Sequence, residues 1–155
     1  MTPLHLACQN NQPVLAGFLI KNGADSNESD HLGKTVLHYA ASQGYFKLID
    51  LLCSFGAIST AKDYEQQTPL HLAAARGSVM SIKALMKNGA LYGVTDILVR
   101  TPLYNAVYYK NDECVEYLFN NGSDINIVSG DKLSPFLLAK KHKSKKILKI
   151  FGYDE

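Results

Sequence analysis

Residues 68–77 read TPLHLAAARG, and this stretch decides the fold because its first four residues return along the chain at a fixed interval. The equivalent stretches are Thr2-Pro3-Leu4-His5, Thr35-Val36-Leu37-His38, Thr101-Pro102-Leu103-Tyr104 and Ser134-Pro135-Phe136-Leu137. Each stretch starts 33 residues after the previous one. The same interval separates four glycines, Gly23, Gly56, Gly89 and Gly122. Two markers in one register indicate an array of structural repeats.

Each repeat predicts two short helices. A Thr or Ser followed by Pro is typical of a helix start, because the hydroxyl accepts from a free amide and Pro fits the first helical position. Gly44 and Gly77 each end a first helix, and apolar residues at helical spacing, such as Leu48 and Leu52, predict a second. Helices this short are marginal alone, so neighbouring repeats must bury each other's apolar faces. The predicted capping residues are Thr2, Thr35, Thr68, Thr101 and Ser134, with His5, His38 and His71 beside them.

Two short helices and a turn in 33 residues, opened by TPLH, resemble the ankyrin repeat. The resemblance covers residues 2 to about 152 and implies an all-α solenoid of stacked helix-turn-helix units joined by β-hairpin-like loops. We expect a single domain over residues 1–155. Its repeats are expected at residues 1–30, 31–63, 64–96, 97–129 and 130–155.

The two ends depart from the repeat pattern. The first repeat has no leading loop, which indicates a fragment of a longer protein or a frayed end. In the last repeat Gly152 follows Ser134 by 18 residues, where the other repeats take 21, so we expect both of its helices to be shortened. This shortened repeat is expected to cap the array.

Composition agrees with a globular chain of one domain. Apolar residues make up 46% and charged residues 19%, with a net charge of +2. No apolar run approaches the roughly 18 residues that a membrane span needs, and residues 1–20 do not resemble a signal peptide. The three cysteines, Cys8, Cys53 and Cys114, form no CxxC pair and are typical of a reduced compartment. We therefore expect an intracellular, cytoplasmic protein, with the nucleus also open, and no membrane insertion.

The regular histidines do not predict a metal site. His5, His38 and His71 occur once per repeat, so stacking separates them by about 10 Å, whereas zinc needs ligands at about 2.1 Å. A hydrogen bond to the capping Thr or to nearby backbone is the favoured interpretation, and the resemblance implies the same role. No motif places a nucleophile beside a base, and no P-loop or GxGxxG is present. We expect no enzymatic activity, no cofactor and no metal.

Six lysines lie between residues 140 and 149. A solvated face on the terminal repeat is the favoured interpretation, because such a face prevents aggregation. Binding of nucleic acid or of an acidic partner is the weaker alternative. Nucleic acid is disfavoured because the run contains no arginine and offers no aromatic stacking platform before Phe151 and Tyr153.

Two segments predict a modification. Residues 118–126 (LFNNGSDIN) and 19–27 (LIKNGADSN) resemble ankyrin-repeat segments that the hypoxia-linked asparaginyl hydroxylase modifies. The resemblance implies Asn126, and less closely Asn27, as candidate sites. Alternatively, these Asp and Asn residues only shape the turn.

The triplet Ile97-Leu98-Val99 predicts a contact surface. An Asp at positions 30, 63 and 96 aligns the loops, so Ile97 and Leu98 take the most exposed positions of their loop and Val99 replaces the turn glycine. Exposed aliphatic clusters often mark a binding site, and Tyr and Arg are favoured contact residues. In the alternative interpretation, the triplet packs locally against the next loop.

The resemblance implies partner binding through the concave surface made by loop tips and first helices. We therefore expect a monomeric, non-catalytic adaptor or scaffold that binds another protein or a peptide. The predicted contact residues are His31, Leu32, Lys34, Tyr64, Glu65, Gln67, Arg76, Ile97, Leu98, Val99, Arg100, Tyr108 and Tyr109. The alternative is a targeting or regulatory domain of a larger enzyme or channel.

Overall fold

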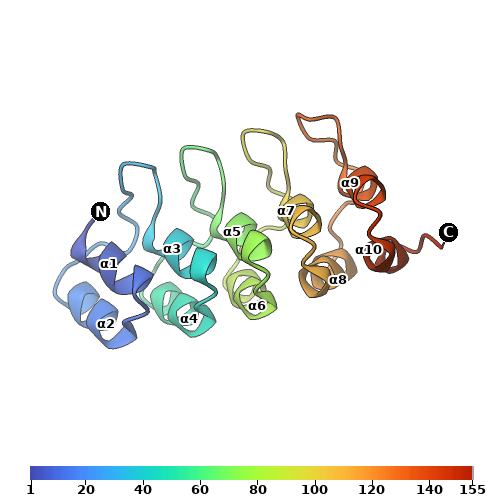
Figure 1. Cartoon of the computed structure of the whole chain (residues 1–155). Helices are drawn as coiled ribbons and strands as arrows, with labels where there is room; N and C mark the ends of the chain where they lie inside the picture. The colour runs from blue at the N-terminus through green and yellow to red at the C-terminus, as the bar shows by residue number, and fades with distance from the viewer. Residues whose placement is uncertain (155) are drawn as a thin grey trace.

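A computed structural model describes residues 1–154. This part of the chain forms ten α-helices and no β-strand, which confirms the predicted all-α solenoid. The helices are α1 (Pro3–Gln9), α2 (Pro13–Lys21), α3 (Val36–Gln43), α4 (Phe46–Ser54), α5 (Pro69–Arg76), α6 (Val79–Lys87), α7 (Pro102–Tyr108), α8 (Asp112–Asn120), α9 (Pro135–Lys141) and α10 (Lys145–Ile150). Figure 1 shows five helix pairs side by side, with a loop projecting between each pair and the next.

The first helix of every pair begins at a Thr or Ser in extended conformation. The hydroxyls of Thr2, Thr101 and Ser134 accept from the backbone N–H three residues later, at 3.3, 3.2 and 3.2 Å. This bond satisfies a free amide of the first turn. Each first helix therefore has the same start, and the five lie parallel in one row (Figure 1).

A left-handed residue follows every first helix. It is Gly44 after α3 and Gly77 after α5, with φ of +79° and +84°. The same repeat position holds Asn11, Lys110 and Lys143, with φ between +51° and +57°. A non-glycine residue is disfavoured there, so the tight turn between paired helices is imposed by their packing rather than by local preference.

The core runs as one layer along the array. The leucine of the TPLH stretch is almost completely buried in Leu4, Leu37, Leu70 and Leu103. Small residues beside it, such as Ala40 and Ala73, are fully buried and let the first helices approach closely. Because each helix pair buries its neighbours' apolar side chains, the loops are left outside this core.

The buried histidines tie each first helix to the following loop. Nδ1 of His38 lies 3.0 Å from Thr35 Oγ1, and Nε2 lies 2.9 Å from the carbonyl of Gln67. His5 and His71 make the same two bonds. A carbonyl only accepts, so Nε2 carries the proton. Nδ1 accepts the backbone N–H of the capping Thr, at 3.1 Å in His38, so it has no proton and the ring is neutral. Burial lowers the pKa of His38 and His71, which keeps those two rings uncharged.

The last junction uses different residues for this link. Tyr104 takes the histidine position, and its hydroxyl donates to Asp131 at 2.6 Å. Ser129 Oγ donates to the carbonyl of Leu133 at 2.7 Å, as the imidazole does in the other repeats. The loop thus stays anchored without a histidine.

The shortening of the last repeat is confined to its second helix. α10 has six residues, whereas α2, α4, α6 and α8 have nine. α9 has seven, as many as α1 and α7, so the prediction that both helices are shortened is wrong. Lys143 keeps the repeat position of Gly44, which places the missing residues after the first helix.

The N-terminal end exposes an apolar face. Val14 and Phe18 on α2 are 86% and 61% exposed. Leu15 is 42% exposed, whereas Leu48, its equivalent one repeat later, is buried. The difference arises because, within residues 1–154, α4 packs between α2 and α6, whereas α2 packs against α4 alone in that row. No helix within residues 1–154 has the length and apolar character of a membrane span.

Candidate functional site

The loop tips are joined in a row by single backbone hydrogen bonds. Tyr64 N–H donates to the Leu32 carbonyl at 3.1 Å, and Ile97 N–H donates to the Glu65 carbonyl at 2.9 Å. Gly130 N–H donates to the Leu98 carbonyl at 2.7 Å. The tip backbones therefore hold each other in place, although residues 1–154 contain no assigned strand.

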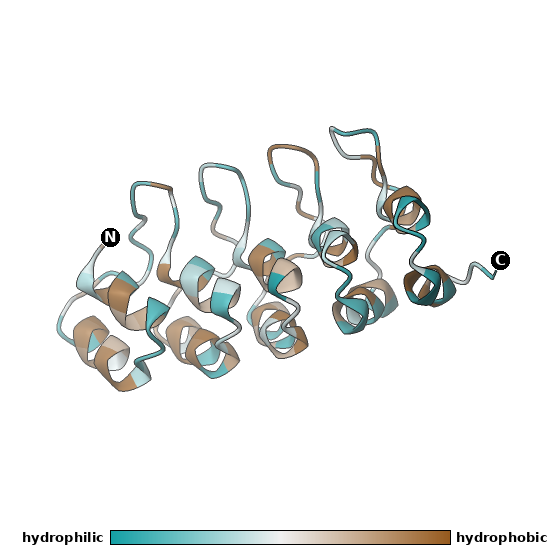
Figure 2. Ribbon diagram, viewed as in Figure 1, coloured by the Kyte–Doolittle hydropathy of each residue, from teal (hydrophilic) through white to brown (hydrophobic). Residues whose placement is uncertain are grey.

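The residues of the triplet are exposed to water. Ile97, Leu98 and Val99 are 63%, 50% and 45% exposed. Figure 2 shows the α6–α7 loop in brown, the hydrophobic end of the scale, and the α4–α5 loop mostly in teal. The α6–α7 loop is thus held by its backbone while its aliphatic side chains stay in contact with water.

Val99 also has an unfavourable backbone conformation. Its φ is +60°, in the left-handed region that a β-branched residue rarely adopts. Gly33 holds this position in the α2–α3 loop, where an added Cβ would lie 2.6 Å from the Tyr64 ring. The next loop after Val99 offers Gly130 in place of Tyr64, so the valine side chain has room. Its conformation is strained even so.

A cavity of about 320 Å³ lies below the tips, between α5 and α7 and their loops. Five predicted contact residues line it: Glu65, Gln67, Arg100, Tyr108 and Tyr109. Leu72, Ala75, Tyr104 and Asn105 complete the lining. The remaining predicted contact residues do not line it. His31, Leu32 and Lys34 belong to the α2–α3 loop, Tyr64 and the triplet belong to the tips, and Arg76 is exposed at the end of α5.

Tyrosines form the wall of this cavity on the α7 side. The rings of Tyr104 and Tyr108 are stacked, with centroids 6.5 Å apart, and Tyr109 meets Tyr108 edge-on at 5.0 Å. Tyr108 and Tyr109 are 52% and 58% exposed, so their rings are available to a partner. Tyr104 is buried, and burial together with its bond to Asp131 raises its pKa to about 12.

Arg100 is already engaged within its own loop. Its Nε and Nη2 bind Asp96 Oδ2 at 2.8 and 2.7 Å. Burial alone would raise the pKa of Asp96, but the bonds from Arg100 lower it, so the carboxylate is ionised. Arg100 therefore brings little net positive charge to the cavity, and the free carboxylate of Glu65 dominates its rim.

Sequence reasoning missed Leu72, which lines this cavity, and the carboxylate of Asp63. Asp63 Oδ2 is buried and has no hydrogen-bond partner within residues 1–154. The signal was present in the aligned repeats, because Leu72 stands where α3 carries Tyr39. The tyrosine hydroxyl bonds the equivalent Asp30, and a leucine cannot.

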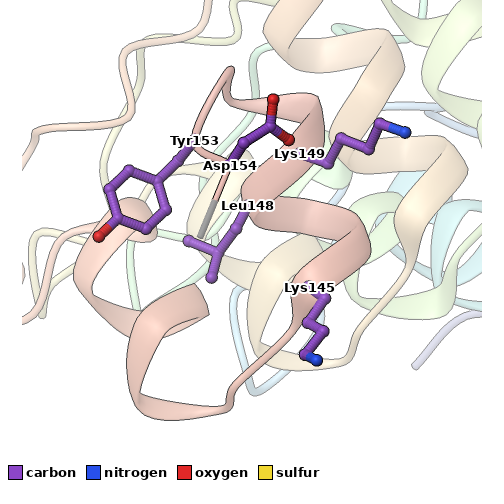
Figure 3. Close-up of a pocket in the computed structure, with 5 residues that line it drawn as sticks. All are labelled: Lys145, Leu148, Lys149, Tyr153 and Asp154. Atoms are coloured by element: carbon purple, nitrogen blue, oxygen red, sulfur yellow. The ribbon is translucent and has the colours of Figure 1, made fainter.

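A second cavity, of about 200 Å³, lies at the C-terminal end beside α10. Figure 3 shows Tyr153 on one side of it and Lys145 and Lys149 on the other. Phe151 is buried against Phe119, and Lys140 Nζ lies 4.6 Å from the centre of the Tyr153 ring. Neither ring is presented freely for stacking on a base, which favours a solvated end over a nucleic-acid site.

The histidines and cysteines were also considered as metal ligands and as nucleophiles. Residues 1–154 contain no group of three side chains able to hold a metal ion. Burial raises the pKa of Cys8 and Cys114 to about 12 and that of Cys53 to about 11, so all three thiols are protonated at neutral pH. A thiol rather than a thiolate is a poor nucleophile.

The two candidate hydroxylation sites differ in accessibility. The side-chain amide of Asn27 donates to the Gly56 carbonyl at 2.9 Å and accepts from Ile58 N–H at 2.8 Å. Asn126 is exposed, and its backbone N–H is held by Asp124 at 2.8 Å. Asn126 is thus the more accessible side chain, and its modification stays a prediction.

Known proteins share the repeat found here. A family model of ankyrin repeats in three copies matches residues 1–63 and 56–129. NF-kappa-B inhibitor delta of Mus musculus is 46% identical over 43 residues, and NF-kappa-B inhibitor alpha of Rattus norvegicus is 51% identical over 43. The ADP-ribosylation factor GTPase-activating protein AGD2 of Arabidopsis thaliana is 44% identical over 41.

These similarities cover short segments. The two inhibitors match over 28% of this chain and 13% and 14% of their own lengths, and AGD2 matches over 26% and 5%. The chain thus matches only a small part of the curated relatives. The family model, in contrast, reaches from residue 1 to residue 129 and agrees with five stacked helix pairs and their capped first helices. The chain therefore belongs to the ankyrin-repeat family.

Proposed function

We propose that this chain is a non-catalytic interaction module that binds a protein or peptide segment. The proposed surface consists of the loop tips from α2–α3 to α6–α7 and the exposed sides of α5 and α7. The exposed triplet Ile97-Leu98-Val99 carries this proposal, because it keeps three aliphatic side chains in water on a backbone that is otherwise held in place. Ankyrin repeats are generally protein-interaction modules, which supports the same class of function.

The energetics favour a partner at the triplet. Covering a large aliphatic side chain stabilises a contact by about 1.5–3 kcal/mol, and about half of each triplet side chain is open. Val99 places a β-branched residue at a left-handed position that Gly33, Gln66 and Lys132 occupy in the other loops. Tyr64 and Tyr108 are 69% and 52% exposed and extend the surface with residues that often dominate binding energy.

The relatives' names support binding without identifying the partner. Two of the similar proteins are named as inhibitors of NF-kappa-B, an activity exerted on another protein. AGD2 is named as a GTPase-activating protein and matches over a small part of its length. That match favours the second candidate function, a targeting or regulatory unit within a larger enzyme.

The test is Ile97→Asp combined with Leu98→Asp. Affinity capture from the source cell compares this tip variant with the wild type and with the control Ile58→Asp/Leu91→Asp. The control residues are also exposed, at 53% and 59%, but lie at the base of the loops. The wild type and the control are expected to retain the same partner, and the tip variant to lose it.

Two further measurements make the test decisive. The free energy of unfolding of the tip variant should stay within about 1 kcal/mol of the wild type, as is usual for exposed positions. Binding should weaken little with rising ionic strength, whereas a lysine-based site for nucleic acid would lose about 10³–10⁵ in affinity. Unchanged capture by a folded tip variant would refute the proposal.

A further inference from the structure

Three loop aspartates shape their loops in the same way. Oδ1 of Asp30, Asp63 and Asp96 each accepts two backbone N–H groups, from the residues two and four positions later, at 2.9–3.0 Å. The second carboxylate oxygen, Oδ2, faces away from these bonds and needs a donor from elsewhere. The three loops differ in what supplies it.

Two of the three loops provide that donor internally. Tyr39 on α3 donates its hydroxyl to Asp30 Oδ2. Arg100 donates through Nε and Nη2 to Asp96 Oδ2 at 2.8 and 2.7 Å. Oδ2 of this aspartate can therefore be bonded either by a hydroxyl from the following helix or by a guanidinium from its own loop.

Asp63 has neither donor. Leu72 stands in the place of Tyr39 and has no hydrogen to donate, and Gln67 stands in the place of Arg100 but bonds only Oδ1, through its backbone N–H. The Asp63 residue is 2% exposed, and its Oδ2 has no partner within residues 1–154. Burying a carboxylate oxygen without a donor is costly, and few such atoms occur in folded proteins.

Asp63 does not itself line the cavity between α5 and α7, but the two residues that replace its donors, Gln67 and Leu72, do. A group that entered the cavity would approach Asp63 past the same two positions from which Tyr39 and Arg100 reach their aspartates. The exposed carboxylate of Glu65 stands at the rim of this route.

Charge and aromatic surface indicate what this group is. Arg100 is neutralised by Asp96, while no cationic side chain within residues 1–154 forms a salt bridge with Glu65 or Asp63. Arg76 is exposed at the end of α5 and does not line the cavity. The open rings of Tyr108 and Tyr109 form the opposite wall, and such rings attract cations.

The geometry points to a binding site for a basic side chain, an arginine by preference, of the partner segment. The guanidinium would donate to Asp63 Oδ2 and to Glu65 and lie against Tyr108. Arginine is preferred over lysine because the chain already binds a guanidinium at the equivalent Asp96, and a planar fork can serve two acceptors. This inference rests on the proposed function and names the chemistry that anchors the partner there.

The test uses N-acetyl-arginine amide as the probe, with the lysine and citrulline analogues beside it. Binding is followed by NMR chemical shifts of the backbone amides of Gln67 and Tyr108 in the full chain. We expect saturable shifts with the arginine compound, weaker binding of the lysine compound, and none of citrulline, which has arginine's shape without its charge. Equal binding of citrulline, or no saturable shift at the cavity, would overturn the inference.

Three variants separate a binding role from a structural one. Asp63→Asn keeps an oxygen for the two loop bonds, so it should fold at least as stably as the wild type and bind arginine at least about tenfold more weakly. Asp30→Asn is the matched control, and it should leave arginine binding unchanged because Asp30 already has Tyr39. Leu72→Tyr supplies the donor found in α3 and should block the probe. Unchanged arginine binding in Asp63→Asn would refute the site.

The outcome stays distinct from that of the proposed function. If the tip variant loses its partner but arginine does not bind the cavity, the interaction module stands and this inference fails. If arginine binds and the tip variant captures the same proteins as the wild type, the cavity site stands and the proposed tip surface fails.

Discussion

The substitution His71→Leu tests whether the buried imidazoles hold the array together. His71 is completely buried on α5. Its Nδ1 lies 3.1 Å from the Thr68 amide and 2.9 Å from the Thr68 hydroxyl, and its Nε2 lies 2.8 Å from the Arg100 carbonyl. Leucine approximates the volume of the ring and removes all three contacts.

The expected loss can be worked out from the groups left behind. The Thr68 amide loses its acceptor, and the Arg100 carbonyl keeps only the bond from Asp96 N–H at 3.0 Å. A buried polar group without its partner costs about 1–3 kcal/mol. With one amide unpaired and one carbonyl weakened, we expect the free energy of unfolding to fall by about 3 kcal/mol. The substitution removes both contacts at once, because the same imidazole bonds the capping Thr68 and the carbonyl of Arg100 in the next loop.

Urea unfolding followed by far-UV circular dichroism measures this loss. His31→Leu is the matched control, because His31 is exposed in the α2–α3 loop, and it should change stability by at most about 0.5 kcal/mol. A His71→Leu protein within about 1 kcal/mol of the wild type would refute the role assigned to the ring.

Two other expectations concern stacking and pH. Leu48→Ala should destabilise the chain by about 3 kcal/mol and Leu15→Ala by less than about 1 kcal/mol in urea unfolding, because the preceding repeat covers only Leu48; equal losses would contradict this. Burial lowers the pKa of His38 and His71 in the folded chain. Below their unfolded pKa of about 6.5 the unfolded chain therefore binds more protons, so the free energy of unfolding decreases as the pH is lowered. Unfolding measured from pH 7.5 to 5 should show this loss, and a His38→Gln/His71→Gln variant should show a flatter profile.

The fold could be predicted because its determinants are local and repeated. A capping Thr or Ser, a Pro and a glycine mark each helix pair, and the 33-residue interval sets their order. The length of α9 could not be predicted, since the distance from Ser134 to Gly152 does not show which helix loses residues. The left-handed conformation of Asn11 and Lys110 could not be predicted either, because packing holds these non-glycine residues in a region that they disfavour.

The candidate site was predicted only in outline. Glu65, Tyr108 and Tyr109 were among the predicted contact residues, and all three line the cavity; their role in binding stays a prediction. Alignment of the loops could not show that Arg100 is engaged by Asp96, which depends on one rotamer. The unpaired oxygen of Asp63 was equally hidden, since it appears only when every donor around it has been assigned.

Residues at equivalent positions of different repeats can be compared directly, and this comparison identifies the candidate site. Every unfavourable feature of the loops has a favourable equivalent elsewhere in the chain, glycine for Val99 and tyrosine for Leu72. The array accepts both alternatives at those positions, so folding alone does not require the unfavourable residue. Leu72 lines the cavity together with the exposed Tyr108 and Tyr109, and Val99 precedes Arg100, which lines it too. A residue such as Leu72, which leaves Asp63 without the donor that Tyr39 supplies to Asp30, is expected where a ligand provides the missing contact.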